Sequence, residues 1–266
     1  MASFLDAYTA PKKDIPQRAY LTVSMLVAGS LFALWCVLSY GDLVRSDFLP
    51  SPGAVLVAAS TGLNDGSLLV NTWTSLAEIM SGFVLASILA VPLGILMGSF
   101  KIVEAAIEPL TNFVRYLPVS ALIPLLILWV GIDMWEKVTV IFIGTFFQQL
   151  IMIADVSRNV PQDLLDVSYT LGATRRTVVG RVLIPATMPG VMDTLRVTLG
   201  WAWTYLVVAE LVAANKGLGY FILNSMRGLF TDQIFLGIMV IGLLGLISDR
   251  LFELLRNRML PWAAQV

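Results

Sequence analysis

The sequence predicts an all-α polytopic membrane protein with about six transmembrane helices. The chain has 266 residues, of which 58% are hydrophobic and only 13% are charged. A typical soluble domain has about twice that charged fraction. Apolar runs between charged residues reach about 17–25 residues once their ends are included, which is the length that a hydrocarbon core of about 30 Å requires. The runs cover residues 21–40, 79–100, 116–132, 138–154, 197–209 and 233–248.

The first run is predicted to be a retained span and not a cleaved signal peptide. Its apolar part is longer than the h-region of such signals, and no small-x-small cleavage site follows it. Residues 1–20 are therefore expected to form a cytoplasmic segment, and residues 21–262 a single transmembrane domain. The segment 41–72 is rich in Pro, Gly, Asn and Asp, which predicts turns around one short helix.

Lysine and arginine in the loops predict the orientation. With six spans both termini share a side, and the side richer in these residues is expected to be cytoplasmic. That side collects Lys12, Lys13, Arg18, Lys101, Arg158, Arg175, Arg176, Arg181, Arg256 and Arg258. The opposite side has Arg45, Lys137, Lys216 and Arg227.

Composition argues against several kinds of site. The chain has no histidine, and its formal net charge is −1. No imidazole ligand or histidine base exists, and no overall basic field attracts nucleic acid. The single cysteine, Cys36, lies in an apolar run and is expected to be a buried small hydrophobe. We predict no catalytic residue and no metal site.

The polar segment 157–190 is predicted to fold as two short helices joined at Gly172. Asn159 is expected to cap the first helix, and Thr174 the second, which Pro185 and Pro189 would end. One face of the first helix is expected to carry residues at helical spacing, namely Leu164, Val167, Ser168 and Leu171. From pattern and charge alone this loop is either an interfacial helix on anionic headgroups or a docking element for a cytoplasmic partner.

The loop resembles the "EAA" loop of ATP-binding-cassette (ABC) importer permeases. That pattern is Glu-Ala-Ala, three residues, Gly, nine residues, Ile, one residue and Leu-Pro. The positions here are Asp166-Val167-Ser168, Gly172, Val182 and Ile184-Pro185. The spacing is kept throughout, although Val167 and Ser168 replace the two alanines. The segments 115–132, 200–222 and 256–262 resemble the nitrate/sulfonate/taurine/bicarbonate branch of these permeases.

The resemblance implies a type I ABC importer permease in the bacterial inner (plasma) membrane. Such a permease pairs with a second copy, two cytoplasmic ATPase subunits and an extracytoplasmic binding protein. The chain has no G-x-x-x-x-G-K-[ST] motif, so ATP and Mg²⁺ are expected on the ATPase subunits. The solute would be a small anion such as nitrate, bicarbonate, cyanate, taurine or a sulfonate. The residues expected to couple to the ATPase are Asp166, Gly172, Thr174, Arg175 and Arg176.

Polar residues inside the spans are candidates for the solute pathway. They are Gln148, Gln149, Trp201, Thr204, Tyr205 and Glu210. The glutamines could instead hydrogen-bond between helices, and the aromatic residues could pack or form a dimer seam. Glu78 and Glu210 could form a gate or a structural pair, with Lys216 or Arg227 as the expected partner. The spacing of the small-residue series that begins at Gly82 predicts a tight helix seam instead of a site.

Two other classes of protein remain alternatives. A stand-alone secondary transporter or channel would favour carboxylates near the midplane or inverted repeats, and neither is evident. A membrane-embedded enzyme would need a nucleophile, metal ligands or paired carboxylates at one depth, whereas the acidic residues here are scattered.

Overall fold

The computed structural model describes residues 16–262, without the side chain of Ala213, and every regular element in this part is helical. Most of the expected N-terminal segment, residues 1–15 with Lys12 and Lys13, lies outside the described residues. The elements are α2 (Gln17–Tyr40), α3 (Pro52–Asn64), α4 (Ser67–Ser99), α5 (Lys101–Val114), α6 (Val119–Val130), α7 (Met134–Arg158), α8 (Gln162–Thr170), α9 (Arg175–Val178), a π-helical turn η1 (Val179–Leu183), α10 (Ile184–Ala213), α11 (Leu218–Arg227) and α12 (Thr231–Met259). The predicted all-α membrane fold and the short helix within 41–72 are confirmed.

Small residues hold α4 and α7 in close contact over most of their length. A Cβ atom added at Gly82 would lie 2.7 Å from Cβ of Ile141, and one at Gly94 would lie 2.8 Å from Cβ of Ile153. Ala86, between these glycines, is fully buried. The predicted helix seam is thus confirmed. Because residue numbers rise together along both helices, α4 and α7 run parallel.

The parallel pairing requires α5 and α6 to carry the chain back across the membrane. Ser99 at the end of α4 lies beside Ser157 near the end of α7, with 2.9 Å between their Oγ atoms. Since α4 and α7 end on the same side, the chain must cross again before α7 begins. The crossing is made by α5 and α6 together, which are bent by 95° at the break between them.

The prediction of one span over residues 116–132 is therefore wrong. The helix α6 has only 12 residues, which is about 18 Å and too short to cross alone. The turn between α5 and α6 ends at Pro118, which has no backbone N–H and disfavours helix in the residue before it. With the bent pair counted as one span, residues 16–262 contain six candidate membrane spans, five of them long continuous helices.

Two predicted helix boundaries in the loop 157–190 are also wrong. Asn159 follows the last residue of α7, and the first helix of the loop starts after Pro161 with no side-chain cap. Pro185 and Pro189 lie within α10 and do not end a helix. The wider π-helical turn before Pro185 accommodates the proline, because it removes the close approach to the carbonyl four residues earlier.

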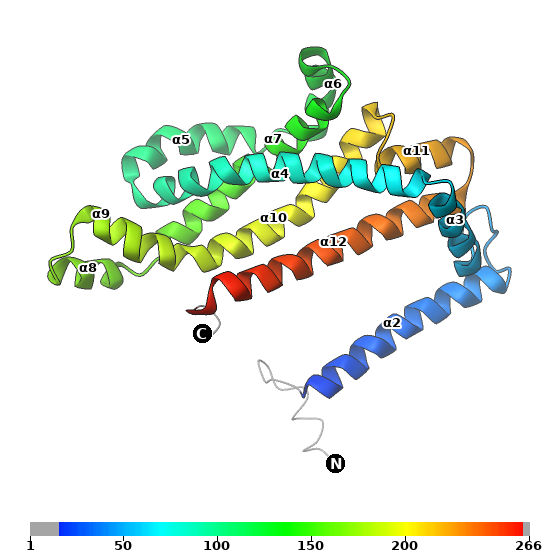
Figure 1. Ribbon diagram of the computed structural model, residues 1–266, viewed down its shortest axis with the longest axis horizontal. Coiled ribbons are helices and arrows are strands. Elements are labelled where there is room, and N and C mark those ends of the chain that lie inside the picture. Colours follow the sequence, from blue (N-terminus) through cyan, green and yellow to red (C-terminus); the bar gives the residue numbers. More distant parts are fainter. Residues whose placement is uncertain (1–15, 263–266) are drawn as a thin grey trace.

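The remaining helices complete a bundle around α4 and α7 (Figure 1). The helix α10 runs antiparallel to α7, and α12 packs against α10. The helix α2 lies apart and has no buried residue. Its C-terminal half is attached through Trp35, whose Nε1 donates to the carbonyl of Pro50 (2.9 Å) and whose ring stacks on Phe235. The start of α2, the end of α12 and the α8–α9 region lie toward one side of the molecule.

We expect Gly94→Ala to destabilise the fold, because the new methyl group would lie 3.0 Å from the carbonyl oxygen of Leu150 as well as against Ile153. Overpacking of this kind costs about 1–3 kcal/mol. The matched control is Gly245→Ala in α12, where no atom lies within 4 Å of the added Cβ. Thermal unfolding in detergent should show a lower midpoint only for Gly94→Ala, and equal midpoints would contradict the close seam.

Candidate functional site

The loop between α7 and α10 forms a rigid projection, which we call the foot (residues 162–178, α8 and α9). Gly172 has φ +81°, in the left-handed region. Its N–H donates to the carbonyl of Tyr169 (2.9 Å), and the N–H of Ala173 donates to that of Ser168 (3.1 Å). These two bonds make a Schellman motif, which ends α8 and fixes the turn into α9. The predicted bend at Gly172 is confirmed.

The foot exposes apolar side chains. Leu164, Val167 and Leu171 lie on one face of α8 and are 48%, 59% and 82% exposed. None of the residues of α8 is buried. Apolar side chains that recur on one exposed face of a stiff helix are typical of an interaction surface.

All five expected coupling residues are exposed on the foot. Asp166 and Arg176 are exposed, and no atom lies within 4 Å of a Cβ added at Gly172. Thr174 caps α9 as predicted, with Oγ1 accepting from the N–H of Thr177. Arg175 differs, because its guanidinium stacks on the ring of Phe100 at 4.9 Å.

The contact with Phe100 fastens the foot to the corner between α4 and α5. A second tie lies next to it, where Arg158 at the end of α7 pairs with Glu104 of α5 (2.9 Å). The foot is therefore in contact with the corner between α4 and α5, and it is joined to α7 and α10 through the chain. The sequence did not identify Phe100 or Glu104, since each is paired with a residue more than fifty positions away.

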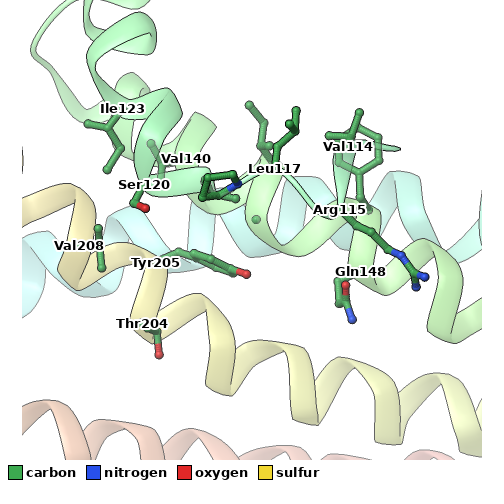
Figure 2. Close-up of a pocket in the computed structure, with 15 residues that line it drawn as sticks. Val114, Arg115, Leu117, Ser120, Ile123, Val140, Gln148, Thr204, Tyr205 and Val208 are labelled. Atoms are coloured by element: carbon green, nitrogen blue, oxygen red, sulfur yellow. The ribbon is translucent and has the colours of Figure 1, made fainter. Parts of the chain in front are cut away.

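A cavity of about 240 Å³ lies where α6, α7 and α10 meet at the break after α5 (Figure 2). Three of the candidate pathway residues line it, namely Gln148, Thr204 and Tyr205. The ring of Tyr205 lies across Gly144, where an added Cβ would be 2.6 Å away. Glycine at this position lets the tyrosine reach over α7 into the cavity. Arg115 lines the same cavity from the turn after α5.

The other three candidate pathway residues lie elsewhere. Gln149 is fully buried and donates to Ser87 Oγ and Thr198 Oγ1, both at 3.2 Å, so it links three helices. Trp201 is 37% exposed and is not one of the residues that line the cavity. Glu210 is buried nearer the opposite end of α10 from the foot.

Glu210 belongs to a buried polar cluster at the end of the bundle opposite the foot. Its Oε1 accepts from Ser75 Oγ and its Oε2 accepts from the N–H of Gly219, both at 2.5 Å. Ser75 in turn accepts from the N–H of Leu218 (2.8 Å). These bonds fasten the turn between α10 and α11 to α4, so the carboxylate lies within packed protein.

The cation of this cluster is Lys137, so the expected partners Lys216 and Arg227 are wrong. Lys137 Nζ lies 3.9 Å from both Glu78 and Glu136 and is almost fully buried. Lys216 and Arg227 are exposed. Because Lys137 lies directly before the apolar run 138–154, the sequence predicts that it lies in a loop. The neighbouring Glu136 was the available sign that Lys137 forms a buried ion pair.

Comparison with known proteins agrees with this architecture. The model of the family described as "Binding-protein-dependent transport system inner membrane component" matches residues 90–261, more than half of the chain. The chain belongs to this family. The permease is 38% identical over 214 residues to a probable ABC transporter permease protein of Brucella melitensis, covering 80% of this chain and 87% of that one. It is 30% identical over 256 residues to the taurine transport system permease protein of Escherichia coli, covering 94% and 93%.

A solved structure shares the fold of the permease. It is an inward-facing conformation of the MetNI methionine ABC transporter, with a TM-score of 0.57 and 20% sequence identity over 68% of this chain and 92% of that one. The predicted type I importer permease fold is confirmed, and the protein is a membrane permease subunit of an ABC importer.

We expect Lys137→Met to destabilise the permease strongly, because Glu78 and Glu136 would lose their only nearby cation in the described part of the chain. Removing one partner of a buried ion pair costs about 3–5 kcal/mol. Lys216→Met is the control, since exposed substitutions usually change stability by less than about 0.5 kcal/mol. Thermal unfolding of both variants in detergent checks this, and a wild-type midpoint for Lys137→Met would contradict it.

Proposed function

We propose that the permease works as a homodimer whose two feet each bind a cytoplasmic ATPase subunit. The exposed row of Leu164, Val167 and Leu171 on a stiff helix is the observation that carries this proposal. A rigid foot can be gripped and displaced as a body, whereas a flexible loop would absorb the movement. The contact of Arg175 with Phe100 would let that displacement act on the start of α5.

The energy source in this proposal is ATP bound with Mg²⁺ on the ATPase subunits. This chain has no G-x-x-x-x-G-K-[ST] motif to cradle phosphates. ATP binding would draw the two feet together and open the pathway toward an extracytoplasmic binding protein that delivers the solute. The two access states are then two arrangements of one bundle, biased by the motor.

The foot and both ends of the permease would face the cytoplasm of a bacterial cell. Loop charge supports this orientation, because arginine gathers on the side of the foot, at Arg158, Arg175, Arg176 and Arg181. In the opposite orientation the foot would lie outside the cell, where a cytoplasmic ATPase subunit could not bind it.

The solute in this proposal is a small anion, in the class of taurine, sulfonates, nitrate, bicarbonate and cyanate. The relative from Escherichia coli is named for taurine, which carries a sulfonate group. The cavity supports the same class, since Arg115 is the one formally charged side chain among the residues that line it. Because the chain belongs to the family of binding-protein-dependent transport components, an importer subunit is favoured over a stand-alone transporter.

We expect Leu171→Asp to abolish capture of the ATPase subunit. The side chain is 82% exposed, so a charge there leaves the fold intact but opposes burial in a partner. The permease would be tagged, solubilised with its own ATPase subunits and tested for their co-purification. Leu229→Asp is the matched control, because Leu229 is 86% exposed in the turn before α12. Undiminished capture by Leu171→Asp would contradict docking through the foot.

Gly172→Val should uncouple ATPase activity from transport without loss of the permease from the membrane. Any side chain at φ +81° is strained, at a cost of about 1–2 kcal/mol, so the angle between α8 and α9 should change. Gly180→Ala is the control, because Gly180 lies in the π-helical turn with no atom within 4 Å of an added Cβ. Solute-stimulated ATPase rates in nanodiscs check this, and wild-type stimulation in Gly172→Val would refute it.

A further inference from the structure

Arg115 occupies an unusual position for a cation. It caps the C-terminal end of α5, at the break in the middle of the bent span, and lines the cavity formed with α6, α7 and α10. A fixed positive charge at such depth is costly and is normally paired or functional. The side chain is partly buried and held against the ring of Tyr116, with Cζ 4.8 Å from the ring centroid.

The guanidinium of Arg115 lacks an anionic partner within the described part of the chain. One of its nitrogens donates to the hydroxyl of Tyr116 (3.0 Å), and its buried Nε has no acceptor among the described residues. By contrast, Lys137 and Arg256, which also lie between helices, each have a carboxylate within 4.0 Å. Arginine offers five N–H donors, so most of the recognition capacity of Arg115 is unused.

The neighbouring side chains suit an oxyanion. All three side chains line the cavity, and Figure 2 shows the amide of Gln148 between the hydroxyl of Tyr205 and the guanidinium of Arg115. Ser120 adds a second hydroxyl, and no carboxylate is among the residues that line the cavity. Several donors thus line one cavity without an opposing negative charge, which favours an anion and disfavours a cation.

We propose that Arg115, Gln148 and Tyr205 form a site inside the permease that binds the oxyanionic head group, a sulfonate or a carboxylate, of a small organic solute. The inference rests on the proposed function, since it takes the solute to be an anion that passes through this cavity. It goes further by giving the permease a selective site of its own, in addition to any selectivity of the binding protein.

Size and wall chemistry favour a compact organic anion. The cavity of about 240 Å³ is smaller than most drug-sized pockets, which begin near about 300 Å³. Ile123, Val140 and Val208 form apolar walls beside the polar groups. A short aliphatic chain can lie against these walls while two oxygens of the head group accept a bidentate pair of bonds from Arg115.

The break in the span explains how such a site could release its solute. Arg115 lies in the turn after α5, and the start of α5 adjoins Phe100, which contacts Arg175 of the foot. Glu104 of α5 pairs with Arg158 at the end of α7, next to the foot. A movement of the foot would shift Arg115 relative to Gln148 and Tyr205, which lie on α7 and α10. The three donors come from three separate elements. A small rotation of one element relative to the others would therefore be enough to separate the donors and release the anion.

The test measures anion-dependent stabilisation of the purified permease–ATPase complex. Thermal unfolding would be followed over a concentration series of ethanesulfonate, propionate and ethylammonium at constant ionic strength. We expect ethanesulfonate or propionate to raise the unfolding midpoint of the wild type, and ethylammonium to have no effect. In Arg115→Gln the concentration needed for half the stabilisation should rise by about tenfold or more, because a charge-assisted bidentate contact is lost.

Two further variants sharpen the result. Arg115→Lys keeps the charge without the bidentate geometry, so it should respond with intermediate affinity, and it also serves if Arg115→Gln does not fold. Arg227→Gln removes an exposed arginine at the opposite end of the bundle from the foot and should respond as the wild type does.

Three outcomes would overturn the site. They are no stabilisation by either anion, equal stabilisation by ethylammonium, or an unchanged response of Arg115→Gln. If the ATPase subunits co-purify while the anion response is missing, the inference fails and the proposed function stands. If they do not co-purify, the proposed docking fails, and the same concentration series on the permease alone still decides whether Arg115 binds the anions.

Discussion

The parallel contact between α4 and α7 is the constraint on which the rest of the structure depends. Glycines at 82 and 94 remove the side chains that would keep the two helices apart, and the isoleucines of α7 fill that space. Parallel neighbours cannot be joined by a tight turn, so the chain must cross the membrane between them. The crossing is made by two short helices with a 95° bend, and this bend places Arg115 and a cavity inside the bundle. A site at membrane depth therefore follows from a packing requirement elsewhere.

The same arrangement connects the foot with the helices that line the cavity. The foot lies between α7 and α10, whose inner faces carry Gln148 and Tyr205, and it is also pinned to the α4–α5 corner through Arg175 and Phe100. Two helices that line the cavity, α7 and α10, are thus joined to the foot through the chain, and the corner before α5 touches it through a packed contact. Close-packed interfaces tend to switch between discrete arrangements instead of deforming gradually. In the proposed mechanism, a displacement of the foot would accordingly rotate the helices that line the cavity relative to one another.

Local chemistry made part of this structure predictable. The left-handed turn at Gly172, the cap at Thr174 and the small-residue seam that begins at Gly82 each depend on residues a few positions apart, and all three are confirmed. The span over 116–132 was mispredicted because the bend depends on how α4 and α7 pair, which no local pattern encodes. Likewise Lys137 and Glu78 meet only through that pairing. Gln148 and Gln149 have the same chemistry in sequence, but they are one residue apart on a helix and so face a cavity and a packed core respectively.

The distribution of unmet interactions distinguishes structural polar groups from functional ones. Around Glu210 the two carboxylate oxygens, the Ser75 hydroxyl and the backbone of the turn into α11 bond to one another, so these particular groups need no outside partner. The foot and the cavity differ, since one leaves Leu171 exposed and the other leaves the Arg115 Nε without an acceptor in the described chain. Neither feature stabilises the isolated fold, because an exposed leucine and a buried Nε without an acceptor both reduce stability. A protein surface bound at the foot and an anion bound at the break would each complete one of them.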